Sequence, residues 1–253
     1  MELMAADALP DVRPAPCAGV LVPPSNPTVE PELARCLEGV MTLFAARFPV
    51  MPGTTLEQRN RRYVQVYRDS VRAFGELALS AIVIGLTGPS YRLMPLGDRA
   101  LMDELSTVAG VPVITASAAI GEALAALGGR RICLLSPYPK WLTADALRYW
   151  QAAGQEIVQV VEISETFRAY TLTSEEIAAA LDRVDYSAID TVVLSGTGML
   201  TLPTITSLRQ TVAKPVLSSN ICCAFSLLRQ AGLRAGSATF AAASPELAER
   251  LAV

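Results

Sequence analysis

Short segments rich in hydroxyl, amide and glycine residues are the groups of this chain that could do chemistry. They are Pro23-Pro24-Ser25-Asn26, Thr87-Gly88-Pro89-Ser90, Ser136-Pro137-Tyr138, Gly196-Thr197-Gly198 and Ser218-Ser219-Asn220. Loops of this composition at helix N-termini donate hydrogen bonds to small anions, particularly carboxylates and phosphates. None of them has the spacing of a P-loop or of a dinucleotide-binding fingerprint. We therefore predict a small carboxylate or a similar oxyanion as the ligand.

The 253-residue chain contains no histidine. This excludes Ser-His-Asp hydrolysis, Cys-His proteolysis and zinc sites built on imidazole. The cysteines show no paired metal-ligand spacing, so we predict no metal site and expect free thiols in a reducing cytoplasm. They stand at positions 17, 36, 133, 222 and 223.

Charge and hydropathy exclude two classes of partner. The formal net charge is −3, and a mildly acidic chain lacks the concentrated basic face that nucleic acid requires. The sequence has no stretch of about 18 uninterrupted apolar residues, so we predict no transmembrane helix. Residues 1–16 have no basic start followed by an apolar stretch, so we predict a disordered leader rather than a signal peptide, and a cytoplasmic protein with no membrane partner.

The elements that must position the polar loops alternate between short apolar strands and longer amphipathic helices. Strands are predicted over residues 18–22, 41–45, 81–86, 111–115, 131–135, 157–163, 191–195 and 215–217. Helices are predicted over residues 56–79, 117–127, 142–153, 174–184 and 221–231. This alternation is typical of a mostly parallel sheet covered by helices, and eight strands would also fit a (β/α)₈ barrel. The polar loops follow strands, where parallel α/β folds bind their ligands.

An internal repeat favours two halves over a barrel. Three pairs of segments recur in the same order: 81–88 with 191–198, 111–117 with 214–220, and 19–25 with 132–138. A barrel would not predict matching strand-end motifs at half-chain spacing. We predict an α/β fold of two pseudo-symmetric Rossmann-like halves, each with a four-stranded parallel sheet, and a site in the cleft between them. The first half takes residues 17–116 plus 220–253, and the second takes residues 117–219.

The same motifs resemble a known family. They are Val22-Pro-Pro-Ser-Asn26, Leu86-Thr-Gly-Pro-Ser-Tyr-Arg92, Leu135-Ser-Pro-Tyr138, Val193-Leu-Ser-Gly-Thr-Gly-Met-Leu-Thr-Leu202 and Val216-Leu-Ser-Ser-Asn220. Over roughly residues 17–235 the chain resembles the aspartate/glutamate racemase superfamily, and within it the maleate isomerase and arylmalonate decarboxylase branch. The resemblance implies chemistry without a cofactor on a small carboxylate substrate. The reaction would pass through an enolate-like state stabilised by an oxyanion hole. The resemblance is also compatible with a homo-oligomer.

The resemblance also implies site residues. By position, Asn26 would contact a substrate carboxylate, and Thr87, Gly88 and Tyr138 would line the oxyanion pocket. Tyr138 is the best proton carrier if a positive neighbour such as Lys140 lowers its pKa, and Ser90 and Arg92 could hold a second carboxylate. The predicted catalytic residues are Tyr138, Thr87 and Thr197. The predicted substrate-binding residues are Pro24, Ser25, Asn26, Gly88, Ser90, Gly196, Gly198 and Asn220.

One departure from the family pattern limits the reaction. Racemases and isomerases of this superfamily use two cysteines, one from each half, and decarboxylases keep only the second. Leu86 and Gly196 occupy these positions, which disfavours two-base racemisation and thiol addition. Three interpretations stay open: a lyase-type or decarboxylase-type enzyme that does not use cysteine, a carboxylate-binding or regulatory homologue without catalysis, and a hydrolase that uses water or a hydroxyl.

Overall fold

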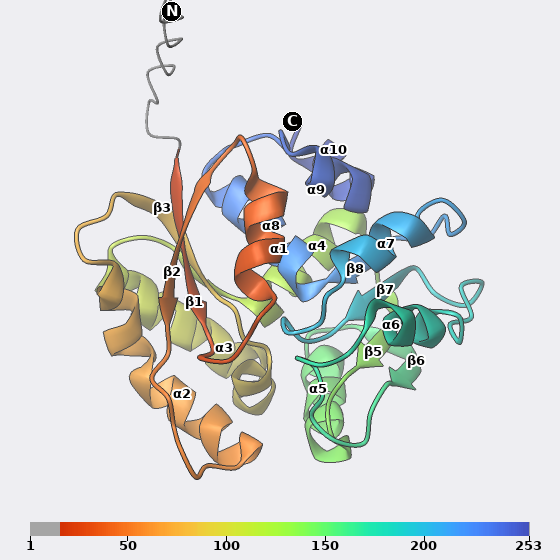
Figure 1. Cartoon of the computed structure of the whole chain (residues 1–253), viewed down its shortest axis with the longest axis horizontal. Helices are drawn as coiled ribbons and strands as arrows, with labels where there is room; N and C mark the ends of the chain where they lie inside the picture. The colour runs from red at the N-terminus through yellow and green to blue at the C-terminus, as the bar shows by residue number, and fades with distance from the viewer. Residues whose placement is uncertain (1–15, 253) are drawn as a thin grey trace, which may run out of the picture.

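Two four-stranded parallel sheets form the framework of the computed structural model, which describes residues 16–252 (Figure 1). Except for its last residue, the expected leader over residues 1–16 lies outside the described residues. The first sheet has the strand order β2-β1-β3-β4 and the second β6-β5-β7-β8. The strands are β1 Cys17–Val22, β2 Thr42–Arg47, β3 Leu79–Ile84, β4 Val113–Thr115, β5 Arg131–Ser136, β6 Glu156–Glu162, β7 Thr191–Leu194 and β8 Val216–Ser218.

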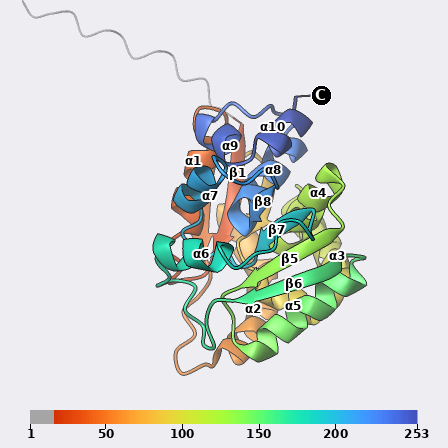
Figure 2. The ribbon, with the colours of Figure 1, turned by 90° about the vertical axis from the view of Figure 1, so that its right-hand side faces the viewer.

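Helices flank both sheets and connect successive parallel strands (Figures 1 and 2). They are α1 Val29–Leu37, α2 Leu56–Val71, the 3₁₀ helix η1 Arg72–Phe74, α3 Gly88–Ala109, α4 Ala116–Leu127, α5 Lys140–Ala152, α6 Ser174–Leu181, α7 Leu202–Leu208, α8 Ser219–Gln230, α9 Ala238–Ala243 and α10 Pro245–Arg250. Within residues 16–252, no helix has the length and apolarity needed to cross a membrane.

The two sheets repeat one arrangement, as the internal repeat predicted. β1, β3 and β4 hold the same places in the first sheet as β5, β7 and β8 hold in the second. The inner strands β1, β3, β5 and β7 are almost entirely buried, which explains why they read as continuous apolar runs. The two separate sheets exclude the closed barrel.

Helices α4 and α8 hold the two halves together. Each begins directly after the last strand of its sheet, and the Thr115 and Ser218 side chains cap their N-termini by accepting a hydrogen bond from a backbone N–H. The two helices pack against each other, and α8 also packs on α1 and β3 of the first half. Residues 219–228 are all buried. This packing supports assigning residues 220–253 to the first half, although the domain boundaries stay a prediction.

The helix predicted over residues 56–79 is too long. Helix α2 ends at Val71, the 3₁₀ turn η1 follows, and Gly75 then adopts a positive φ of 58°. β3 begins at Leu79 because its side chain belongs to the buried face of the first sheet. The hydrophobic periodicity of the segment therefore continued across a helix end and into a strand.

Candidate functional site

A cavity of about 380 Å³ lies between the two halves and is lined by residues of both. Its walls come from loops that follow β1, β3, β5 and β7, which is where parallel sheets present ligand-binding groups. The lining residues that the sequence predicted are Pro24, Ser25, Leu86, Thr87, Gly88, Tyr138, Gly196, Thr197 and Gly198. The fold thus brings most of the predicted site residues together.

A hydroxyl pair joins the two halves inside this cavity. Thr87 Oγ1 and Tyr138 Oη lie 2.5 Å apart. Behind them Tyr91 Oη lies 2.6 Å from Ser195 Oγ, again across the halves, and the Tyr91 and Tyr138 rings meet edge to face. All four side chains are buried or almost so. Since Thr87 is the N-cap of α3, the backbone N–H groups of Gly88 and Ser90 in the first turn have no acceptor inside the helix, whereas Pro89 has no N–H.

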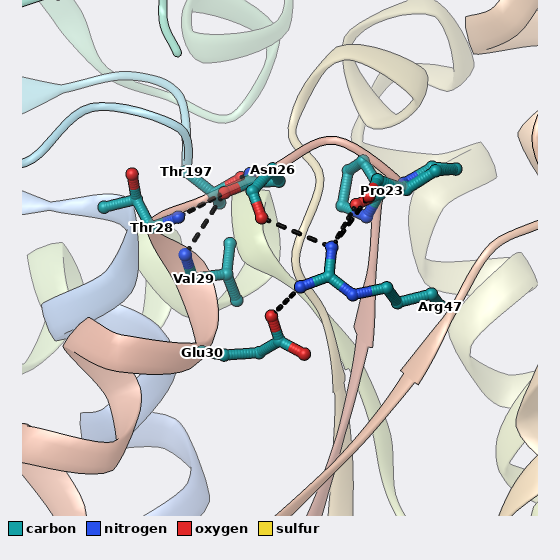
Figure 3. Close-up of polar contacts among 8 residues, drawn as sticks. Pro23, Asn26, Thr28, Val29, Glu30, Arg47 and Thr197 are labelled. Atoms are coloured by element: carbon teal, nitrogen blue, oxygen red, sulfur yellow. Dashed lines mark hydrogen bonds and ion pairs between the residues drawn. The ribbon is translucent and has the colours of Figure 1, made fainter. Parts of the chain in front are cut away.

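The glycine-rich loop over residues 196–198 also lines the cavity, beside Tyr138. Asn26 Nδ2 donates a hydrogen bond to Thr197 Oγ1 at 3.2 Å. Thr197 Oγ1 in turn donates a hydrogen bond to the Gly85 carbonyl at 2.8 Å. Asn26 Oδ1 accepts hydrogen bonds from the N–H groups of Thr28 and Val29, at 2.9 and 3.2 Å (Figure 3). Asn26 is 1% exposed and is absent from the cavity lining. The structure therefore places Asn26 behind Thr197, where it positions the loop.

Asn220 likewise supports the loop from behind. Its Nδ2 donates to the Thr197 carbonyl at 3.1 Å and to Glu32 Oε2 at 2.7 Å. Glu32 in turn accepts hydrogen bonds from the backbone N–H groups of Thr201 and Leu202, 2.5 and 2.8 Å away. Asn220 does not line the cavity. Its predicted role in substrate binding stays a prediction without a contact to support it.

Leu86 and Gly196, the positions that the resemblance assigns to the family's two cysteines, both line the cavity. Leu86 is half-buried and presents an apolar side chain. Gly196 has a φ of 103°, and a Cβ placed on it would lie 2.8 Å from Tyr138 Oη. The Tyr138 hydroxyl thus occupies the space that a side chain at position 196 would need. Among residues 16–252, which include all five cysteines, no thiol lines the cavity.

The cysteines nearest in sequence to the motifs are buried core residues. Cys222 and Cys223 are both buried in α8, and burial raises the pKa of both thiols. Burial also raises the pKa of Cys36 to about 12 and that of Cys133 to about 11. Thiols held protonated in this way do not supply a thiolate nucleophile near neutral pH.

The condition that a positive neighbour such as Lys140 lowers the pKa of Tyr138 is not met. Lys140 is exposed at the start of α5, whereas Tyr138 is 6% exposed. Burial is the largest influence on Tyr138 and raises its pKa above that of an ordinary phenol, against the opposing effect of the Thr87 hydroxyl. The phenol therefore stays protonated and acts as a hydrogen-bond or proton donor rather than as a base.

The expectation that Ser90 and Arg92 hold a second carboxylate finds no support in the geometry. Ser90 is buried outside the cavity lining, beside Asp98. Arg92 Nη1 lies 3.3 Å from Glu57 and 3.8 Å from Asp145, so its charge is already paired. Neither residue lines the cavity.

Other residues of the cavity were not predicted from the sequence. They come from α2 and the loop before it, from the start of α5, and from the loop after β6. They are Val50, Met51, Leu56, Arg59, Asn60, Tyr63, Leu142, Phe167, Ala169 and Tyr170. The available sequence signal was Asn60, a polar residue spaced three and seven residues from Tyr63 and Tyr67 on the buried face of the helix. For a metal ion, the described part of the chain offers no group of three or more suitable side chains.

Comparison with known proteins gives a consistent result. Residues 18–242 match the family model of arylmalonate decarboxylase. Among relatives, the chain is 27% identical to maleate isomerase of Nocardia farcinica over 229 residues, covering 85% of this chain and 90% of the relative. It is 25% identical to maleate isomerase of Alcaligenes faecalis, with 85% and 90% coverage.

Solved structures share the fold. Maleate isomerase of Pseudomonas putida S16 superimposes with a TM-score of 0.83 at 20% identity, covering 93% of this chain and 99% of that one. Nocardia farcinica maleate cis-trans isomerase with a covalently bound succinylcysteine intermediate gives 0.82 at 21% identity, with the same coverage. Arylmalonate decarboxylase gives 0.71 at 22% identity, covering 86% and 93%. These matches confirm the predicted arrangement of two α/β halves.

Proposed function

Because the chain belongs to the arylmalonate decarboxylase family, in the maleate isomerase branch of the aspartate/glutamate racemase superfamily, we propose that it is an enzyme acting on a small carboxylic or dicarboxylic acid. One observation supports this above the others: the Thr87–Tyr138 hydroxyl pair lies in the cavity at the N-terminus of α3. Donors so placed stabilise the negative charge that develops on a substrate carboxylate when it becomes an enediolate.

The type of reaction follows from which groups the cavity contains. A relative carries a succinylcysteine intermediate, and such an adduct needs a thiol that this cavity lacks. Of the described residues in the lining, the titratable ones are Arg59 and three tyrosines, Tyr63, Tyr138 and Tyr170. Burial raises the pKa of each tyrosine. The cavity therefore offers proton donors and no general base near neutral pH, which favours a lyase over a racemase or an isomerase.

Decarboxylation of a malonate-type acid fits these groups. The bond between the α-carbon and one carboxylate breaks, CO₂ leaves, and the electron pair moves into the remaining carboxylate to form an enediolate. Thr87, Tyr138 and the backbone N–H groups hold this charge. The Tyr138 phenol then gives its proton to the α-carbon, and the phenolate recovers a proton from water. The proposed reaction uses no cofactor, and a homo-oligomeric state and a cytoplasmic location stay predictions.

Turnover of a malonate panel tests the proposal. We expect CO₂ release from at least one alkyl- or arylmalonate, and we expect Tyr138→Phe to lower kcat by about 100-fold or more because it removes the donor. Lys140→Gln is the matched control, since its side chain is exposed beside the same loop. An unchanged kcat in Tyr138→Phe would show that the phenol is not the proton donor of the reaction.

The loss of both cysteine positions favours one alternative, a protein that binds carboxylates without converting them. Binding of small acids with no turnover across maleate and the malonates would support this alternative. Hydrolysis by water, the remaining interpretation, would require a general base that the cavity lining does not supply.

A further inference from the structure

Arg47, the last residue of β2, reaches the loop between β1 and α1. Its Nη1 donates hydrogen bonds to the carbonyl oxygens of Pro23 and Pro24, at 3.2 and 2.9 Å, and a longer one to that of Asn26, at 3.4 Å (Figure 3). Its Nη2 pairs with the Glu30 carboxylate. Three carbonyl groups and one carboxylate thus converge on a single guanidinium, whose planar set of five N–H donors suits several acceptors at once.

The loop has few internal hydrogen bonds that could fix its shape. Pro23 and Pro24 have no N–H group and so cannot donate to a neighbouring strand or turn. One backbone hydrogen bond, from the Asn26 N–H to the Pro23 carbonyl at 3.1 Å, closes a turn within the loop. The remaining donors come from Arg47, which is carried by the strand that pairs with β1. Arg47 therefore holds the loop from outside.

The loop shapes the cavity in two ways. The first is direct, because three of its residues belong to the cavity lining: Pro23, Pro24 and Ser25. The second acts across the two halves, because Asn26 Nδ2 donates a hydrogen bond to Thr197 Oγ1 at 3.2 Å. Arg47 itself is absent from the cavity lining. A shift of the loop would thus move a wall contributed by the first half and loosen the support of Thr197 in the second.

We propose that Arg47 is a positioning residue for the reaction, which holds the loop of residues 23–26 and, through Asn26, the side chain of Thr197. The assignment rests on the proposed function. Carbonyl oxygens bonded to the guanidinium are kept from turning toward the substrate, where their partial negative charge would oppose a carboxylate and the enediolate formed from it. The precise placement of groups around a substrate also has a large effect on the rate.

Kinetics on the full chain, with an acid that the malonate panel shows to be converted, test this role. We expect Arg47→Ala to lower kcat per folded molecule by about 10- to 100-fold, because the loop and Thr197 lose their fixed places. Guanidinium chloride, at a concentration where thermal unfolding shows the variant folded, should raise that kcat by about threefold or more, since the free ion offers the same donors. Sodium chloride at the same ionic strength should not restore it.

Glu30→Gln is the matched control. It removes the same ion pair but leaves the hydrogen bonds from Arg47 to the loop, so its kcat should stay within about threefold of the wild type. Amide exchange provides a readout that needs no turnover. The N–H groups of Thr28 and Val29 donate to Asn26 Oδ1, and we expect their exchange to be about tenfold faster in Arg47→Ala and unchanged in Glu30→Gln. Arg47→Gln replaces Arg47→Ala if the latter does not fold.

The outcomes separate the positioning role from the proposed function. An unchanged kcat, a loss that guanidinium chloride does not restore, or unchanged amide exchange would each overturn the role of Arg47 and leave the proposed function intact. An equal loss of kcat in Glu30→Gln would assign the effect to the ion pair and would also overturn it. If the wild type converts no acid, the proposed function fails and with it the role in a reaction, whereas the exchange rates still show whether Arg47 holds the loop.

Discussion

Gly196 and Tyr138 are interdependent at the scale of single residues. Gly196 adopts a backbone conformation that residues with a side chain rarely adopt. Its lack of a side chain also leaves the space that the Tyr138 hydroxyl occupies. Replacing the glycine by cysteine is therefore not a simple restoration of the family's thiol, because the new Cβ would collide with the phenol.

A side chain at position 196 should destabilise the protein. We expect Gly196→Ala to lower the free energy of unfolding by about 1–3 kcal/mol, since the positive φ of 103° and the Tyr138 contact both oppose a Cβ. Chemical denaturation measures the change. The control is Gly121→Ala in α4, where no atom lies within 4 Å of the new Cβ and no positive φ is present. It should be neutral or stabilising by about 0.5–1 kcal/mol, and an equal loss in both variants would contradict the explanation.

The pH dependence of turnover should reflect the protonated phenol. Because burial raises the pKa of Tyr138 above the usual value of about 10, its donor form persists throughout the range from pH 6 to about pH 10. We expect kcat to show no alkaline fall below about pH 10 in the wild type. A fall centred between pH 7 and 9 that disappears in Tyr138→Phe would contradict the assignment of the phenol as the donor.

At the scale of elements, Glu32 of α1 ties the first half to helix α7 of the second. The side chain is 2% exposed and accepts hydrogen bonds from Thr201, Leu202 and Asn220. Both Glu30 and Glu32 lie in the first turn of α1, where acidic side chains commonly stabilise their own helix. The structure instead pairs Glu30 with Arg47 (Figure 3) and places the Glu32 carboxylate at the N-terminus of α7, where a negative charge is favourable.

Removal of this carboxylate should be costly. Glu32→Ala leaves several buried N–H donors without an acceptor, and we expect the free energy of unfolding to fall by about 2–5 kcal/mol. Glu30→Ala serves as the control because it breaks a partly exposed ion pair, worth about 1 kcal/mol or less. Urea titrations of both variants measure the difference. A Glu32→Ala loss no larger than the Glu30→Ala loss would show that the donors find other partners.

On the scale of the whole molecule, the cavity exists only because the two halves are held together. Buried α8 follows a strand of the second sheet but packs on α1 and β3 of the first half, and α4 packs against α8. The Thr87–Tyr138 and Tyr91–Ser195 pairs add polar contacts across the same boundary. Separation of the halves would expose one face of α8 and leave these hydroxyls unpaired.

Unfolding should therefore be cooperative across both halves. We expect a single calorimetric transition whose calorimetric and van't Hoff enthalpies agree. A bound dicarboxylate at about 100 times its Kd should stabilise the whole transition by about 2.7 kcal/mol. Two resolved transitions, with only one of them shifted by the acid, would indicate halves that unfold independently.

The sequence alone determined the strand pattern, the internal repeat and the pairing of the polar loops. These features are local, since strand periodicity and loop composition depend on neighbouring residues. The tertiary structure decided which polar groups reach the cavity. It placed Asn26 and Asn220 behind Thr197 and paired Arg92 with Glu57. It also brought Arg59 and Asn60 of α2 into the cavity lining. Helix rotation, burial and contacts between the halves set these positions, and none of them is encoded in a short motif.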